Sequence, residues 1–247
     1  MAGSKMSKSN YYPETVIVIP TYNEADNLPK IVEEISSLGI NKIGFIIIDD
    51  GSPDGTGIIA DKLSDKFQGF FKVIHRKSKM GLGTAYVEGF MCALENKAKK
   101  IIQMDADFSH PPKELLIMNN LLDTKDIVVG SRYIYGAGVD PNWSLLRKSI
   151  SFFGNFGIRL LMGLEVRDVT SGFKGYNSHV FQKVILSKLK LKGFGFQAEV
   201  AYWCQKEHLM ITEHPYIFID RKAGNSKMSF GIILEALLKL FLIRIRS

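Results

Sequence analysis

The sequence predicts an α/β protein in which a mostly parallel, twisted β-sheet is flanked by helices. In the first half of the chain, short apolar runs rich in β-branched residues alternate with segments of helical periodicity. This alternation is typical of βαβ units. The runs are continuously apolar, which indicates strands buried on both faces. With 247 residues, 46% of them hydrophobic, the chain can build one substantial core.

The predicted strands are residues 15–20 (TVIVIP), 43–50, 70–75, 101–105 and 126–131. Helices are expected at 24–38, from about 58, from about 83 and after Pro111 and Pro112, where proline suits a first helical turn. The second half is less regular: it predicts a long helix at 143–164, a glycine-punctuated segment at 171–175, a helix near 197–207, a strand near 211–219 and an apolar helix at 230–245.

Polar clusters lie at the carboxyl ends of four of the predicted strands, beginning at Tyr22, Asp49, Asp105 and Ser131. Ligands of parallel sheets bind outside the carboxyl ends of the strands, so these clusters predict a binding site. Asp105 and Asp107, one residue apart, can aim at one hard divalent cation. Such a cation would also use substrate phosphate oxygens. The sequence therefore predicts a site for Mg²⁺ or Mn²⁺.

Asp49 and Asp50 end another apolar run. For Asp50 a contact with nucleotide hydroxyl or N–H groups is favoured over a role as a helix cap. Gly81 and Gly83 match neither the Walker pattern nor the dinucleotide fingerprint. They are interpreted as a flexible turn that opens a helix.

The charge is divided unevenly along the chain. Residues 1–131 carry 15 Lys and Arg against 17 Asp and Glu, whereas residues 132–247 carry 17 against 8. The excess of cations predicts that the second half meets an anionic ligand or surface. Nucleic acid is not expected as a partner, because no stacking motif or recognition helix accompanies the cations. Two cysteines are too few for a disulfide framework or a structural zinc site.

In order along the chain, these motifs resemble the family-2 glycosyltransferases and, among them, the dolichol-phosphate (polyprenol-phosphate) mannosyltransferase branch. The resemblance covers residues 15 to about 230. The matching motifs are PTYNE from Pro20, DDGSPDGT from Asp49, GLGTAY from Gly81, MDADFSHP from Met104, GSRY from Gly130, TSGF from Thr170, FQAE from Phe196 and RKAGNSK from Arg221.

The resemblance implies a GT-A fold and a division of roles among the motifs. The implied donor-nucleotide contacts are Pro20, Tyr22, Glu24, Asp49, Asp50, Asp105 and Ala106. Asp105 and Asp107 would hold the metal on the donor diphosphate, with Ser109 as a weaker, outer contact. The implied acceptor-phosphate contacts are Ser131, Arg132, Arg147, Arg221 and Lys227, and the implied catalytic set is Asp107, Arg132, Arg221 and Lys227.

By the same resemblance, the expected reaction is inverting transfer of mannose from GDP-mannose to dolichyl or polyprenyl phosphate. A phosphate monoester is already mostly dianionic at pH 7, so it needs no general base. Three alternatives stay open: transfer of glucose from UDP-glucose, transfer to a glycan hydroxyl with an acid such as Glu199 as base, and a non-catalytic lipid-binding scaffold. The residues alone do not distinguish GDP from UDP or mannose from glucose.

The expected organisation is a flexible arm at 1–14, a catalytic domain at 15–227 and an amphipathic helix at 228–247 that faces a membrane or a partner. The catalytic domain divides into a donor half at 15–131 and an acceptor half at 132–227. The last helix is too short and too charged to span a bilayer, and with residues 143–164 it is expected to lie at an interface. The expected location is peripheral, on the cytosolic face of the endoplasmic reticulum or of a bacterial inner membrane. A small membrane-anchoring subunit is left open as a partner.

Overall fold

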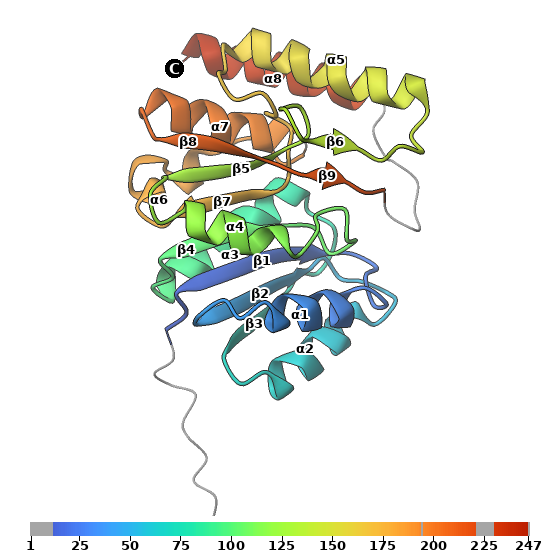
Figure 1. Ribbon diagram of the computed structural model, residues 1–247, viewed down its shortest axis with the longest axis vertical. Coiled ribbons are helices and arrows are strands. Elements are labelled where there is room, and N and C mark those ends of the chain that lie inside the picture. The colour runs from blue at the N-terminus through green and yellow to red at the C-terminus, as the bar shows by residue number, and fades with distance from the viewer. Residues whose placement is uncertain (1–11, 194, 221–229, 247) are drawn as a thin grey trace, which may run out of the picture.

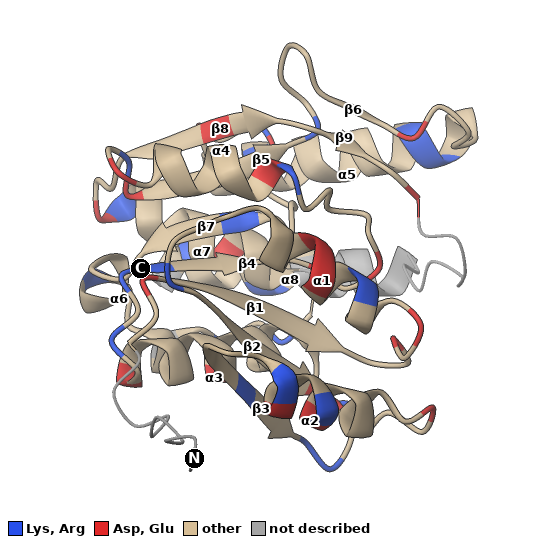
Figure 2. Ribbon diagram, turned by 60° about the horizontal axis from the view of Figure 1, so that its bottom comes forward, with Lys and Arg blue, Asp and Glu red and all other residues tan. Residues whose placement is uncertain are grey.

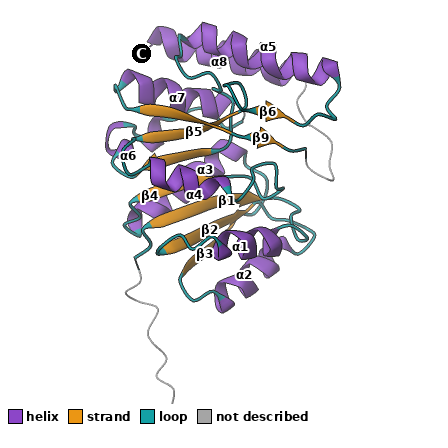
Figure 3. Ribbon diagram, viewed as in Figure 1, coloured by secondary structure: helices purple, strands orange, loops and turns teal. Residues whose placement is uncertain are grey.

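The computed structural model describes residues 12–220 except 194, and residues 230–246. Helices cover both faces of a seven-stranded sheet (Figures 1 and 3). The strands are β1 (Thr15–Thr21), β2 (Ile43–Asp49), β3 (Phe70–His75), β4 (Lys100–Gln103), β5 (Ile127–Ser131), β6 (Gly138–Val139), β7 (Lys174–Asn177), β8 (Ile211–Pro215) and β9 (Ile217–Phe218). The helices are α1 (Leu28–Ser37), α2 (Thr56–Lys66), α3 (Leu82–Glu95), α4 (Glu114–Leu121), α5 (Leu145–Met162), α6 (Val180–Lys183), the 3₁₀ turn η2 (Leu186–Lys188), α7 (Gly195–Lys206) and α8 (Phe230–Arg246).

The sheet has the strand order β3-β2-β1-β4-β7-β5-β8. All neighbours run parallel except β7, which pairs antiparallel with both β4 and β5. The predicted mostly parallel sheet is therefore confirmed. The sequence interpretation gave residues 171–175 only as a glycine-punctuated segment, and β7 begins within it. The single strand expected at 211–219 is two strands in different sheets, because β9 leaves β8 to pair with β6.

The core lies on both faces of the sheet, as the continuous apolar runs predict. Val16 and Val18 point into a cluster beneath α3, α5 and α7, whereas Ile17 and Ile19 point into a second cluster beneath α1, α2 and α4. All four side chains are completely buried. In Figure 2 the inner strands β1 and β2 are almost free of charged residues, whereas β3, β7 and β8 each carry one.

At one end of the molecule, α8 packs against α5 and α7 (Figure 1). The helix expected at 228–247 is thus present from Phe230. Within the described part of the chain, no helix combines the length and apolarity that crossing a bilayer requires. Residues 1–11, most of the expected arm, and 221–229 lie outside the described residues.

Two helix glycines provide a matched test of this packing. A Cβ at Gly89 of α3 would lie 2.4 Å from Val18 Cγ1, whereas a Cβ at Gly154 of α5 would meet nothing within 4 Å. We expect Gly89→Ala to lower the free energy of unfolding by about 1–3 kcal/mol through overpacking. Gly154→Ala should raise it by about 0.5–1 kcal/mol, since alanine favours a helix. Urea denaturation measures both values, and equal effects would contradict the close contact of α3 with β1.

Candidate active site

The site is built at the edge where the parallel strands end. β1 and β2 pair in register, with Thr21 opposite Asp49, so the segments after these two strands leave the sheet together. β4 and β5 run in the same direction, which brings the clusters after Gln103 and Ser131 to this edge. Because β7 is antiparallel, the loop before Lys174 enters here too. The structure thus gathers all four predicted clusters.

The acid pair is held by short-range contacts. Asp105 Oδ1 accepts a hydrogen bond from the Tyr86 hydroxyl at 3.1 Å, and the Asp105 backbone N–H donates to His110 Nδ1 at 3.0 Å. Asp107 Oδ1 accepts from the Ser109 backbone N–H at 3.0 Å. Between the acids and Ser109, Phe108 has a φ of +62°. This tight turn fixes the two carboxylates relative to the end of β4.

The carboxylates suit a cation that is completed by substrate. Among the described residues, no three His, Cys, Asp or Glu side chains gather closely enough to hold a metal ion by themselves. Mg²⁺ is commonly bound by one or two carboxylates together with substrate phosphates. Asp105 and Asp107 fit that pattern, with the remaining ligands left to a phosphorylated substrate and water.

His110 lies beneath the acid pair as a neutral ring. Burial lowers its pKa, against the opposing pull of Asp105 and Asp107, and Nδ1 accepts the hydrogen bond from Asp105. The ring stacks on Phe173 with centroids 4.9 Å apart. Its fixed position supports the loop that carries the acids.

The predicted nucleotide acids differ in their contacts. Asp49 closes the turn after β2, where its Oδ1 accepts from Thr21 Oγ1 at 3.2 Å and Ser52 Oγ at 2.5 Å. Asp50 Oδ1 lies 2.8 Å from Nη1 of the buried Arg76. Burial raises the pKa of Asp50, although Arg76 pulls it in the other direction. Arg76 follows β3, so the strand-end rule that found the other clusters would also have found it.

The other predicted nucleotide residues lie at the ends of β1 and β4. Pro20 is half-buried within β1 and Ala106 is buried between the acids. The Tyr22 ring lies beneath Lys79 Nζ, 3.9 Å from the ring centroid. Glu24 Oε2 accepts from Asn27 Nδ2 at 2.8 Å.

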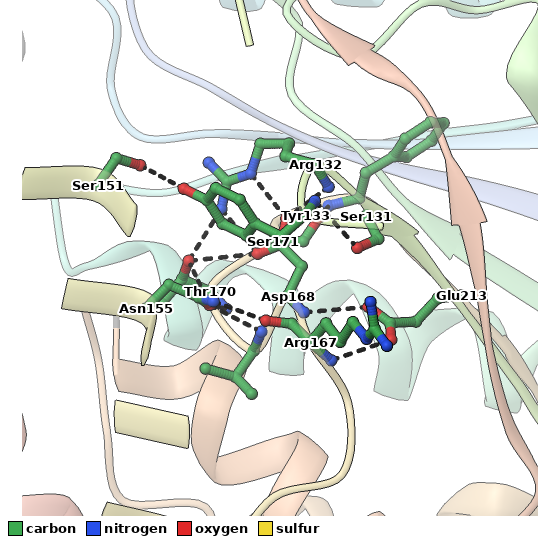
Figure 4. A network of polar contacts seen from close by, with 12 residues as sticks. Ser131, Arg132, Tyr133, Ser151, Asn155, Arg167, Asp168, Thr170, Ser171 and Glu213 are labelled. Atoms are coloured by element: carbon green, nitrogen blue, oxygen red, sulfur yellow. Dashed lines mark hydrogen bonds and ion pairs between the residues drawn. The ribbon is translucent and has the colours of Figure 1, made fainter. Parts of the chain in front are cut away.

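Arg132 is held by a buried carboxylate that the sequence interpretation did not identify. Its Nε and Nη2 donate to the two oxygens of Asp168 at 2.7 and 2.8 Å, and Nη2 also donates to Thr170 Oγ1 (Figure 4). Burial alone would raise the pKa of Asp168, but the guanidinium more than offsets this and holds it below the usual range. The Arg132–Asp168 pair is therefore fully ionised at pH 7.

The loop that carries Asp168 is anchored from two sides (Figure 4). Glu213 of β8 accepts from the backbone N–H groups of Arg167 and Asp168 at 2.9 and 3.0 Å. Asn155 of α5 accepts from the N–H groups of Val169 and Thr170. Both anchors lie far from residue 168 in sequence, so no local motif marks them. Ser131, at the end of β5, is completely buried beside this network.

Aromatic rings connect the acid side of the site with the cation side. The Phe218 ring lies 6.2 Å from the His110 ring and 5.7 Å from the Arg132 guanidinium carbon. Phe218 also meets Trp143 edge-on, and Arg147 lies over the Trp143 ring at 4.0 Å. Arg147 is paired through both terminal nitrogens with Asp220. Arg221 and Lys227 lie outside the described residues.

Glu199, the acid considered as a base for a hydroxyl acceptor, is used in hydrogen bonds that hold a backbone segment. Its carboxylate accepts from the backbone N–H groups of Lys190 and Leu191 at 2.8 to 3.0 Å. The side chain is 1% exposed. A groove of about 480 Å³ between α3 and residues 186–192 is lined by none of the predicted site residues.

Lys174, at the start of β7, is buried under the site. Nζ donates to the backbone oxygen of Gln197 at 2.8 Å. Burial lowers the pKa of Lys174 to about 8, against the opposing effect of Asp168.

The lowered pKa gives a signed pH dependence. Between about pH 8 and 10.5, the ordinary value for lysine, the unfolded chain holds a proton that the folded chain has lost. The Lys174 contribution to the free energy of unfolding therefore rises with pH in this range, by on the order of 3 kcal/mol. Urea denaturation of the wild type and Lys174→Met at pH 7.5 and 10.5 isolates it. We expect the free energy of unfolding of the wild type to rise relative to that of Lys174→Met between pH 7.5 and 10.5. The absence of such a relative rise would contradict a lowered pKa of Lys174.

Known proteins resemble this chain over most of its length. The model of the family described as glycosyl transferase family 2 matches residues 16–185. Polyprenol monophosphomannose synthase of Mycolicibacterium smegmatis is 38% identical over 226 residues, 91% of this chain and 84% of that protein. Undecaprenyl-phosphate mannosyltransferase of Micrococcus luteus is 37% identical over 219 residues, 89% of each chain.

Solved structures share the fold. Glucosyl-3-phosphoglycerate synthase of Mycobacterium tuberculosis with Mn²⁺, UDP and glucosyl-3-phosphoglycerate superposes with a TM-score of 0.63 at 17% identity, covering 94% of this chain and 80% of that chain. The same enzyme with Mg²⁺ and UDP gives a TM-score of 0.65 at 16% identity, covering 94% and 79%. The α/β architecture is thus the GT-A fold. The chain belongs to glycosyltransferase family 2 and is a glycosyltransferase.

Proposed function

We propose that this enzyme transfers a mannosyl group from GDP-mannose to a polyprenyl or dolichyl phosphate, with inversion at the sugar C1. The observation that carries the proposal is the similarity to two proteins named for mannosyl transfer to polyprenyl phosphates, which extends over about nine tenths of the chain. It is supported by the carboxylates and the buried arginine at one edge of the sheet.

On the donor side, Asp105 and Asp107 hold a divalent cation together with the diphosphate of the nucleotide sugar. The cation, when bound, supplies positive charge for the leaving diphosphate. The solved relatives were crystallised with Mn²⁺ or Mg²⁺ and UDP, which supports this assignment. Tyr22, Glu24 and Asp50, with their neighbours Pro20 and Asp49, bind the nucleoside.

On the acceptor side, Arg132 receives the lipid phosphate, with Arg147, Arg221 and Lys227 as further cations and Ser131 as a further contact. Arginine matches phosphate geometry well. Asp168 and Thr170 hold Nε and Nη2 of Arg132, and for Nη1 the described residues supply no hydrogen bond. We propose that this nitrogen donates to the acceptor phosphate.

The reaction is a single displacement. A phosphate oxygen of the lipid forms a bond to the sugar C1, the bond from C1 to the diphosphate oxygen breaks, and GDP leaves with the electron pair. A dianionic phosphate has no proton to lose, so no general base acts. The chain's contribution is to orient two anions and to offset their repulsion.

The lipid acceptor requires access to a membrane, and α5 provides a suitable surface. Its exposed apolar side chains are Leu145, Leu146, Ile150, Phe152, Phe153, Phe156 and Leu160. α8 adds Leu238, Phe241, Leu242 and Ile245. Apolar helix faces with adjacent cations such as Lys148 and Arg159 are typical of interfacial binding. We infer that the enzyme binds peripherally, on the cytosolic face.

Product formation tests the reaction. Purified protein is incubated with radiolabelled GDP-mannose, Mn²⁺ or Mg²⁺ and a short polyprenyl phosphate, and label is counted in the organic phase. We expect metal-dependent transfer that falls at least about a hundredfold in Asp107→Ala, because the cation loses a ligand. Transfer only from UDP-glucose would change the donor, and product formed only with a free polyprenol or a glycan would overturn the phosphate acceptor.

Vesicle binding tests the surface. Phe153 of α5 and Ile58 of α2 are 65% and 63% exposed. Replacement of either by Glu therefore removes a similar, small fraction of buried side-chain surface. We expect Phe153→Glu to reduce flotation with phosphatidylcholine–phosphatidylglycerol vesicles severalfold, because a charge on the apolar face opposes insertion. Ile58→Glu should leave flotation unchanged. Equal flotation of the two variants would contradict a membrane role for α5.

A further inference from the structure

The turn from Gly81 to Tyr86 is a tightly packed element, not only a flexible helix start. A Cβ on Gly81 would lie 2.8 Å from the Lys192 carbonyl oxygen, and a Cβ on Gly83 would lie 2.5 Å from that of Leu191. The Gly83 N–H donates to the Lys192 oxygen at 2.8 Å. These glycines let the start of α3 approach the backbone of residues 191–192, where any side chain would intervene.

Residues 190–192 are themselves fixed. The buried Glu199 of α7 accepts the N–H groups of Lys190 and Leu191. The start of α3 is therefore held between the sheet and a segment anchored to α7. One turn further along, this places Tyr86 at a defined depth in the core.

Tyr86 has no room to move. The side chain is completely buried, and its ring stacks on Phe90 with centroids 5.9 Å apart and on Phe196 at 6.2 Å. The hydroxyl is the polar end of this fixed ring, and it donates to Asp105 Oδ1 at 3.1 Å. A carboxylate that receives a hydrogen bond from an immobile donor is restricted in its rotation about the Cβ–Cγ bond.

The same turn reaches the other donor-side acid. Thr84 Oγ1 accepts from Arg76 Nη2 at 2.6 Å, and Arg76 Nη1 lies 2.8 Å from Asp50 Oδ1. The first two turns of α3 thus contact acids that follow two different strands, Asp105 directly through Tyr86 and Asp50 through Arg76.

We propose that Tyr86 is a positioning residue of the donor site, whose fixed hydroxyl orients the Asp105 carboxylate for the divalent cation of the nucleotide diphosphate. The inference rests on the proposed metal role of Asp105, and it gives the Gly81–Tyr86 motif a function. Mg²⁺ and Mn²⁺ bind in narrow geometries, so a ligand that must be ordered on binding lowers affinity.

The chain offers a matched control. Tyr176 is also completely buried, and its hydroxyl also donates one hydrogen bond of 3.1 Å, to Gln103 Oε1. Tyr86→Phe and Tyr176→Phe each remove one hydroxyl from the same core and should lower the midpoint of thermal unfolding to a similar extent. Only the first removes a contact with an acid of the pair.

The experiment measures Mn²⁺ binding from the loss of the free-ion electron paramagnetic resonance signal, with GDP and, separately, with UDP present. We expect Tyr86→Phe to raise the dissociation constant of Mn²⁺ about tenfold or more. Tyr176→Phe should remain within about twofold of the wild type, and Asp105→Asn should abolish binding.

Equal dissociation constants for the two phenylalanine variants would overturn the positioning role. Failure of the wild type to retain Mn²⁺ with either nucleotide would overturn it together with the metal assignment. Because this readout needs neither sugar nor lipid, it is independent of the acceptor. A wild type that binds Mn²⁺ but makes no mannolipid contradicts only the proposed reaction, and the comparison of the two variants still decides the role of Tyr86.

Discussion

The ion pair between Arg132 and Asp168 is the constraint around which the cation side of this molecule is organised. A carboxylate with no exposed surface is stable as an ion only if its charge is matched and its oxygens accept hydrogen bonds. Arg132 meets both needs, through its side chain and its backbone N–H. To hold Asp168 there, the fold uses Asn155 of α5 and Glu213 of β8. The Arg132–Asp168 pair and the residues that hold its loop thus link the end of β5 with β8 and α5.

Other charged side chains at this edge of the sheet are also held in ion pairs. Asp50 forms an ion pair with Arg76, and Arg147 forms one with Asp220. Each charge is thereby oriented before substrate arrives, and less ordering remains to be done at the moment of reaction. On the cation side the uncharged Phe218 ring lies between the His110 ring and the Arg132 guanidinium, within 6.2 and 5.7 Å of them. An edge built in this way leaves its charged side chains little rearrangement to make when a substrate binds.

Much of this arrangement could be predicted from the sequence, because strand-end position is a local property. The apolar runs define the central strands, and the polar residues that follow them must lie at one edge. The partners could not be predicted in this way. Asp168 pairs with an arginine 36 positions away, and Glu199 binds a turn that precedes its own helix. β7 was missed because KGYN is too short and too polar to give a strand signal. Contacts between side chains from different segments of the chain cannot be predicted from the sequence of either segment alone.

The antiparallel strand β7 also determines the order in which the sheet can be completed. β4 and β5 are not neighbours, because β7 lies between them, and it arrives more than 40 residues after β5 has been synthesised. Among the described strands, β5 pairs with β7 and β8. A nascent chain that has reached the end of β5 can therefore assemble β3, β2, β1 and β4. At that stage β4 has an unpaired edge, and β5 lacks the strand that joins it to the sheet. Open edges invite pairing with other chains. The centre of this sheet is closed by a four-residue strand that is synthesised late, so we expect the growing polypeptide to need that edge shielded until β7 is available.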